Sequence, residues 1–183
     1  MNSFRVLPRF GAALLLALCA DTALSDERQA PFEDASRIVS IGGSVTETVF
    51  ALGEQDRLVA RDSTSTYPDI ATKLPDVGYM RALSPEGVLS VNPTGILLLE
   101  GSGPREAIEV LKKASVPLIT VPETYDHAGI LEKIRIVGKA LGQDDKAAEL
   151  SAKVDRELAA AEQLTAGVAE KKRVLFILSL QGG

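Results

Sequence analysis

The predicted fold opens on residues 37–47, which read Arg-Ile-Val-Ser-Ile-Gly-Gly-Ser-Val-Thr-Glu. The β-branched residues predict a buried strand that ends at Ile41, and the glycine pair turns the chain into a helix. Ser44 and Glu47 stand three residues apart, which is the spacing of a capping box. A strand that runs through a tight turn into a helix is the opening unit of a parallel α/β sheet.

The same alternation continues along the chain. Strands are predicted at residues 58–60, 95–99 and 116–121, and helices after Ser84-Pro85, after Pro104, and from Ile130 to Gly142. Between the second strand and the Ser84 helix, residues 61–81 form a loop-rich excursion with one turn of helix after Pro68. We therefore expect an α/β fold with right-handed crossovers.

A long helix and a further strand are predicted near the end of the chain. Residues 144–168 keep apolar side chains in helical phase, and residues 173–179 read as a new apolar strand, shortly before the last residue, Gly183. A lone terminal strand has few partners. We therefore expect that the remainder of a second α/β unit is missing.

The first 25 residues are typical of a secretory signal. Arg5 and Arg9 precede a short apolar stretch, and Ala23-Leu24-Ser25 offers a cleavage site before a polar lead at residues 26–36. Lipidation at Cys19 is the weaker alternative because a large residue, Leu18, precedes that cysteine. Cleavage near Ser25 removes the only cysteine, so no disulfide is expected in the mature chain.

Composition argues against several classes of function. The chain is 45% hydrophobic and 25% charged, an ordinary globular balance, and its net charge of −5 comes without a dense basic run for nucleic acid. With one histidine and no nucleophile-base motif, an enzyme is a weak hypothesis. An anion site at Gly42-Gly43 remains an alternative to a plain tight turn.

The three tyrosines are more informative. Tyr67, Tyr79 and Tyr125 all fall in loops that follow predicted strands, where open α/β sheets bind ligands. Arg81 lies on the same side of an extended segment as Tyr79, and its charge would favour the phenolate form. A phenolate suits ferric iron, and tyrosine is a known haem ligand. The spacing of these residues alone nevertheless favours a structural role for Tyr79, as a ring packed on its loop, over a role as an iron ligand.

Other candidate residues have simpler interpretations. Tyr67 precedes Pro68 and is typical of an ordinary turn aromatic. His127, close to Tyr125, is expected on the surface or at a helix cap rather than as a metal ligand. Glu86 is expected to be a solvated residue in the first turn of a helix, where the helix dipole favours its charge. The alternative is that Glu86 contacts a protein partner.

Four stretches together resemble a known family. They are residues 37–47, residues 60–65 (Ala-Arg-Asp-Ser-Thr-Ser), residues 73–81 (Lys-Leu-Pro-Asp-Val-Gly-Tyr-Met-Arg) and residues 83–89 (Leu-Ser-Pro-Glu-Gly-Val-Leu). They are similar to the periplasmic haem-binding proteins of bacterial haem ABC importers, and the resemblance covers residues 36–183. The Gly-Tyr-Met-Arg block distinguishes it from ferric-siderophore and cobalamin receptors of the same fold.

The resemblance implies a layout for the chain. It implies the helical-backbone (class III) periplasmic binding protein fold, in which two α/β lobes are joined by one long helix. Residues 37–141 would be the N-terminal lobe and residues 144–168 the connecting helix. Residues 173–183 would hold the first strand of a C-terminal lobe that is otherwise absent.

The resemblance also implies roles for individual residues. Tyr79 would be the axial ligand of ferric haem b, carried as cargo, with Arg81 as the partner of its phenolate. No histidine stands near Gly182-Gly183 to add a second ligand, so a five-coordinate iron is expected. Glu86 would dock on an inner-membrane ABC permease.

The implied protein is a periplasmic transport receptor, not an enzyme, and an outer-membrane haem uptake system would be an indirect partner. Weaker cleft candidates are Tyr67, Tyr125 and His127. A siderophore or cobalamin receptor is the alternative function, and a secreted α/β enzyme fragment is a weaker one.

Overall fold

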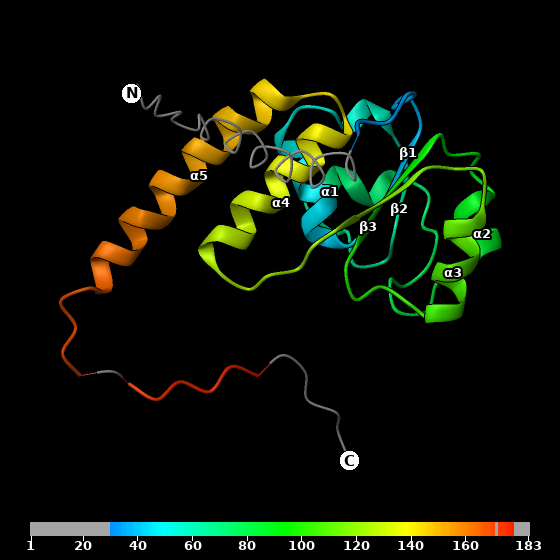
Figure 1. Ribbon diagram of the computed structural model, residues 1–183. Coiled ribbons are helices and arrows are strands. Elements are labelled where there is room, and N and C mark those ends of the chain that lie inside the picture. Colours follow the sequence, from blue (N-terminus) through cyan, green and yellow to red (C-terminus); the bar gives the residue numbers. More distant parts are fainter. Residues whose placement is uncertain (1–29, 171, 178–183) are drawn as a thin grey trace, which may run out of the picture.

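The computed structural model describes residues 30–170 and 172–177 (Figure 1). The expected signal at residues 1–25 lies outside the described residues, as do residues 178–183, which include the end of the expected terminal strand. None of the helices in the described ranges is both long and apolar enough to span a bilayer.

A four-stranded parallel sheet forms the centre of the fold. Its order is β2-β1-β3-β4, with β1 at Ile38–Ile41, β2 at Leu58–Arg61, β3 at Gly95–Leu99 and β4 at Leu118–Val121. The two central strands are buried along their whole length, as expected for strands covered on both faces. This confirms the predicted α/β class.

Helices cover both faces of the sheet. Helices α1 (Gly43–Ala51) and α4 (His127–Ala140) pack on one face, and α2 (Pro85–Leu89) and α3 (Arg105–Lys113) contribute to the other. In β3, Leu97 joins the first core and Ile96 the second, because successive strand residues point to opposite faces. Two 3₁₀ turns, Gln55–Arg57 and Asp69–Lys73, complete the lobe.

Helix α1 begins differently from the prediction. Its N-cap is Gly42, with φ +104°, and no side chain caps it; Glu47 is exposed, so the Ser44-Glu47 capping box does not form. The turn runs so close to β3 that a Cβ on Gly42 would lie 2.5 Å from the Cβ of Leu99. Only glycine fits this conformation and this space, so the helix starts earlier than the capping residues suggest.

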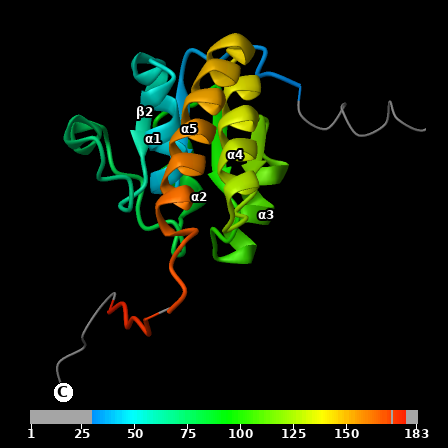
Figure 2. The same cartoon turned by 90° about the vertical axis from the view of Figure 1, so that its left-hand side faces the viewer.

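Helix α5 (Asp144–Thr165) lies along the outside of α4, as Figure 2 shows from the side. It ends at Thr165 rather than at the expected residue 168. Within it only Ala147 is buried, and Leu164 is 84% exposed. The helix therefore leaves the lobe along its length and extends beyond it (Figure 1).

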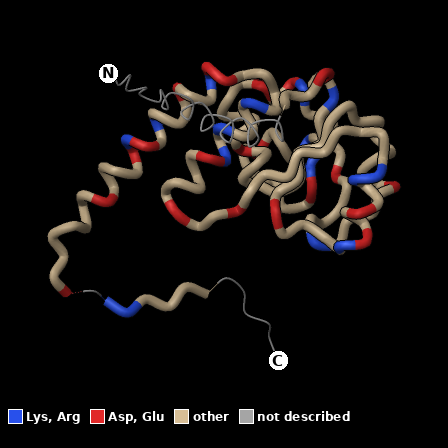
Figure 3. The backbone as a smooth tube through the Cα atoms, in the orientation of Figure 1, with Lys and Arg blue, Asp and Glu red and all other residues tan. Residues whose placement is uncertain are grey.

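The outer helices bury less of their apolar faces than their periodicity predicts. Ile130, expected on the buried face of α4, is 41% exposed, whereas Lys133 is buried. Acidic and basic residues are interspersed along α5 and over the lobe (Figure 3). Periodicity identified the helices correctly, but it could not say how far each face is covered.

The described part of the expected terminal strand, residues 173–177, is not a strand. Its side chains are exposed, with Val174, Leu175 and Phe176 each more than four-fifths accessible. A strand needs a neighbour to pair its backbone groups, and among the described residues no strand lies beside this segment.

Candidate ligand-binding site

The carboxyl ends of the four parallel strands meet at one edge of the sheet. The connections that follow them are the turn at Gly42 and the loops at residues 62–84, 100–104 and 122–126, and we call them together the carboxyl edge. Ligands of open α/β sheets bind outside this edge. The longest of these connections, residues 62–84, carries two of the three tyrosines.

A buried carboxylate joins the first two of these connections. Asp62 is fully buried, and its Oδ1 accepts hydrogen bonds from the Gly42 N–H (2.9 Å) and the Ser65 hydroxyl (2.7 Å). Its Oδ2 accepts from the N–H (3.0 Å) and hydroxyl (2.7 Å) of Thr64. Four donors compensate the loss of hydration, so Asp62 ties the loop after β2 to the turn after β1.

The Asp62 carboxylate also orients a chain of buried hydroxyls. Because Ser65 donates to Asp62, the Ser65 oxygen is left to accept from Thr46 (2.7 Å), and Thr46 in turn accepts from Ser40 (2.6 Å). These three residues are completely buried. The chain connects β1, α1 and the loop after β2 into one rigid support for the carboxyl edge.

The loop around Tyr79 is attached to its neighbours on both sides of that residue. Before it, the Gly78 carbonyl accepts a hydrogen bond from the Ser63 N–H (2.9 Å). After it, the Met80 carbonyl accepts from the Gly103 N–H (2.8 Å), in the loop that follows β3. The Tyr79 backbone is therefore fixed between the loops after β2 and β3.

The Tyr79 side chain is available to a ligand. Tyr79 is 47% exposed, and its hydroxyl makes no hydrogen bond with any residue that the structure describes. Arg81 is exposed in the same loop, and its guanidinium forms no hydrogen bond or ion pair within the described part of the chain. The structure thus places the two side chains in one loop without a hydrogen bond between them.

The other two tyrosines also lie on the carboxyl edge. Tyr67 is 66% exposed in the loop after β2, and Tyr125 is 90% exposed in the loop after β4. Aromatic rings this exposed contribute little to a core. All three tyrosines are therefore free to contact a ligand that covers this edge.

His127 points elsewhere. It is the first residue of α4, and its Nε2 lies 2.9 Å from Asp155 Oδ1 and its Nδ1 3.2 Å from Glu162 Oε1, both on α5. The cap of α4 is Asp126, whose carboxylate accepts from the Gly129 N–H at 2.7 Å. His127 therefore links two helices and does not cap α4.

Lys133 is a residue of this region that sequence reasoning missed. It is only 8% exposed, and its Nζ donates to Ser44 Oγ (2.8 Å) and to Glu123 Oε2 (2.7 Å). The Glu123 N–H in turn donates to Glu100 Oε2 (3.0 Å). Lys133 therefore joins α4 to the start of α1 and to the loop after β4. The only sequence signal was a charged residue beside the apolar stripe of α4.

Glu86 lies on α2 as an exposed carboxylate with a defined geometry. The Ser84 hydroxyl donates to its Oε2 at 2.7 Å and also accepts from the Gly87 N–H at 3.2 Å, which confirms the predicted cap at Ser84. The hydrogen bond from Ser84 lowers the pKa of Glu86, and a backbone hydrogen bond lowers it further. The carboxylate is therefore charged at neutral pH.

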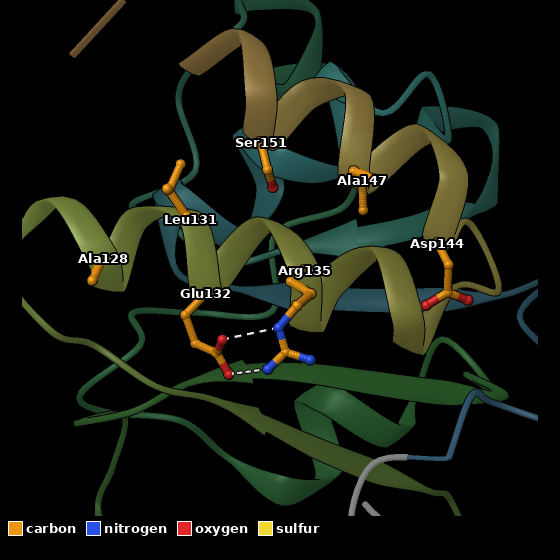
Figure 4. A pocket seen from close by; sticks show the side chains of 8 residues that line it. Ala128, Leu131, Glu132, Arg135, Asp144, Ala147 and Ser151 are labelled. Carbon is orange, nitrogen blue, oxygen red and sulfur yellow. Dashed lines mark hydrogen bonds and ion pairs between the residues drawn. The ribbon is translucent and has the colours of Figure 1, made fainter. Parts of the chain in front are cut away.

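One groove of the structure lies away from the tyrosines. A groove of about 340 Å³ runs between α4 and α5, with the Glu132–Arg135 ion pair on one wall (Figure 4). All its lining residues come from these two helices or their immediate ends, and no loop of the carboxyl edge reaches it. Within the described ranges, no group of three or more acidic, histidine or cysteine side chains is arranged to hold a metal ion.

A parallel α/β lobe whose strand ends carry exposed loops, followed by one long helix, is the fold of a class III substrate-binding protein. The chain belongs to the periplasmic binding protein family, whose model matches residues 38–183. The members of this family are substrate-binding transport proteins and not enzymes, and the family places the protein in the periplasm.

Comparison with individual proteins gives two ligand types. The vitamin B12-binding protein of Yersinia pestis (strain Pestoides F) is 31% identical over 119 residues, which cover 65% of this chain and 39% of that protein. The structure of the periplasmic heme-binding protein RhuT from Roseiflexus sp. RS-1, in apo form, is 39% identical. It superposes with a TM-score of 0.71 over 75% of this chain and 52% of that one.

A periplasmic heme-binding protein from Pseudomonas aeruginosa is also similar, at 33% identity and a TM-score of 0.68 over 72% of this chain and 47% of that one. The chain therefore spans about half the length of these solved structures and less of the curated relative. The chain is thus similar both to heme-binding and to vitamin B12-binding members of the family, and the described residues form one lobe of that fold.

Proposed function

We propose that this protein binds ferric haem b as cargo in the periplasm, with the phenolate of Tyr79 as the axial ligand of the iron. The observation that carries the proposal is the Tyr79 hydroxyl, which lies on the carboxyl edge without a hydrogen-bond partner among the described residues. The heme-binding proteins of Roseiflexus and Pseudomonas aeruginosa support haem as the ligand.

The chemistry of the edge fits this cargo. A phenolate is a hard anionic ligand for ferric iron, and the exposed Arg81 supplies a positive charge in the same loop. The exposed rings of Tyr67 and Tyr125 offer apolar surface to a flat porphyrin. His127 is engaged with α5, so this lobe offers no histidine as a second ligand, and we propose a five-coordinate iron.

The wider transport role follows from the same proposal. Glu86, an exposed and charged carboxylate on α2, would steer docking on an inner-membrane ABC permease. An outer-membrane haem uptake system would supply the cargo indirectly. We propose that export uses residues 1–25 as a signal cleaved near Ser25.

The proposed layout assigns residues 37–141 to the N-terminal lobe and residues 144–168 to the connecting helix. Residues 173–183 would begin the second lobe. Delivery to a permease is proposed for the two-lobed protein, because this lobe supplies one wall of the cleft.

Vitamin B12 is the second candidate ligand, because the Yersinia pestis relative is a vitamin B12-binding protein. A corrinoid brings its own cobalt ligands in its ring and does not require a phenolate from the protein. The two candidates therefore make opposite predictions about Tyr79.

Titration of the purified chain with ferric haem, followed by optical absorption, tests the proposal. We expect saturable binding with the charge-transfer band of a tyrosinate complex, and loss of that band in Tyr79→Phe. Tyr67→Phe is the matched control, because it removes an exposed hydroxyl from the same loop. A cyanocobalamin titration runs in parallel. Saturable cobalamin binding that Tyr79→Phe leaves unchanged, without a tyrosinate band for haem, would establish the second candidate.

A further inference from the structure

Gly78, the residue before Tyr79, has a conformation that needs support. Its φ is +103°, in the region that favours glycine, so the backbone bends immediately before Tyr79. The Gly78 N–H donates to Oδ1 of Asp76 at 2.8 Å, and the Ser63 hydroxyl donates to the same oxygen at 3.1 Å. The Asp76 carboxylate therefore holds the bend through a side-chain turn.

Asp76 is itself anchored to the sheet. Its Oδ2 accepts a hydrogen bond from Arg61 at 2.8 Å, and Arg61 is the last residue of β2. Backbone hydrogen bonds join the same two segments. The Arg61 N–H donates to the Pro75 carbonyl, and the Val77 N–H donates to the Arg61 carbonyl. Asp76 thus transfers the rigidity of β2 to the Tyr79 loop.

The pair also has features that packing alone does not explain. The Nε of Arg61 is buried without a hydrogen-bond partner among the described residues, which is an unfavourable arrangement for a charged donor. The guanidinium nevertheless neutralises Asp76, three residues before Tyr79.

We propose that Asp76, held and neutralised by Arg61, is the positioning residue of Tyr79. It fixes the left-handed bend at Gly78 and thereby presents the phenol to the ligand. This inference rests on the proposed haem function and adds a residue that does not itself touch the ligand.

The test compares Asp76→Ala and Asp76→Asn by haem titration and optical absorption. Asp76→Ala is expected to weaken haem binding about tenfold and to reduce the tyrosinate band, as loss of a residue that orients a metal ligand commonly does. Asp76→Asn keeps an oxygen acceptor for the Gly78 N–H and is expected to restore most of the band. Asp69→Ala, which removes an exposed carboxylate from the same loop, is expected to behave as wild type.

Two results would overturn the inference. One is an Asp76→Ala protein whose unfolding midpoint, haem affinity and tyrosinate band all equal those of the wild type. The other is an Asn variant no better than the Ala variant. If even the wild type lacks a tyrosinate band, the proposed function fails, and amide exchange at Gly78 decides the inference separately. Slow exchange of the Gly78 amide in the wild type and in Asp76→Asn, together with fast exchange in Asp76→Ala, supports positioning by Asp76. Equal exchange in all three proteins refutes it.

Discussion

At the start of α2, the hydroxyl of Ser84 is used twice. It accepts from the Gly87 N–H as the helix cap and donates to the carboxylate of Glu86. The donated bond stabilises the charged form, so the pKa of Glu86 lies below its ordinary value. A carboxyl group whose pKa is lowered in the folded state contributes to the stability of the protein at neutral pH. That contribution disappears as the pH falls through the pKa.

We expect Ser84→Ala to raise the pKa of Glu86 toward its ordinary value and to destabilise the protein by about 1 kcal/mol, because the cap is lost. Carboxyl NMR titration measures the first effect and denaturant unfolding the second. Ser90→Ala is the control, since Ser90 bonds the Gly87 carbonyl at the other end of α2. An unchanged Glu86 pKa in Ser84→Ala would contradict the assignment.

At the scale of elements, the contact between α4 and α5 depends on one small residue. A Cβ on Gly138 would overlap the Cβ of Ala147, the one buried residue of α5 among those described. Ion pairs reinforce the same end of α5, where Glu54 accepts from both Arg57 and Lys146 at 2.6 Å. The base of α5 is therefore closely packed against the lobe.

Gly138→Ala is expected to destabilise the protein by about 2 kcal/mol, because overpacking forces the two helices apart. The change is measured as a shift of the denaturation midpoint. Adding Ala147→Gly should recover part of the loss, since it removes the clashing methyl group. Gly167→Ala, at a position with open space around it, serves as control. If Gly138→Ala were as stable as the wild type, α4 and α5 could move apart without loss of stability, which would contradict the prediction.

At the scale of the whole molecule, α5 changes from a packed helix to an exposed one. Burial falls from Ala147 to Leu164. Among the described residues, the side-chain hydrogen bonds furthest along α5 that reach the lobe join His127 to Asp155 and Glu162. Exposed links of this kind contribute less than about 1 kcal/mol. The far half of α5 is thus held locally rather than by the core.

Amide hydrogen exchange should show protection that decreases along α5. We expect His127→Ala to accelerate exchange in residues 155–165 while changing global stability by less than about 1 kcal/mol. Lys153→Ala, an exposed residue of the same helix, should leave the pattern unchanged. Uniform protection along α5 in both proteins would mean that the helix is held by something other than His127.

The sequence by itself determined the features that depend on near neighbours. Apolar periodicity identified the strands and helices, Ser84-Pro85 defined the start of α2, and turn residues placed Tyr79 in a loop after a strand. These patterns are local, because a cap, a turn or an amphipathic face is encoded within a few residues.

Only the tertiary structure decided the features that join distant residues. The start of α1 at Gly42 depends on the approach of Leu99, and the burial of Lys133 depends on Ser44 and Glu123. The partners of His127 lie 28 and 35 residues away, and the bond from Arg61 to Asp76 crosses a loop. The sequence near each residue cannot reveal such contacts, because they arise only when the chain has folded and separate elements pack together.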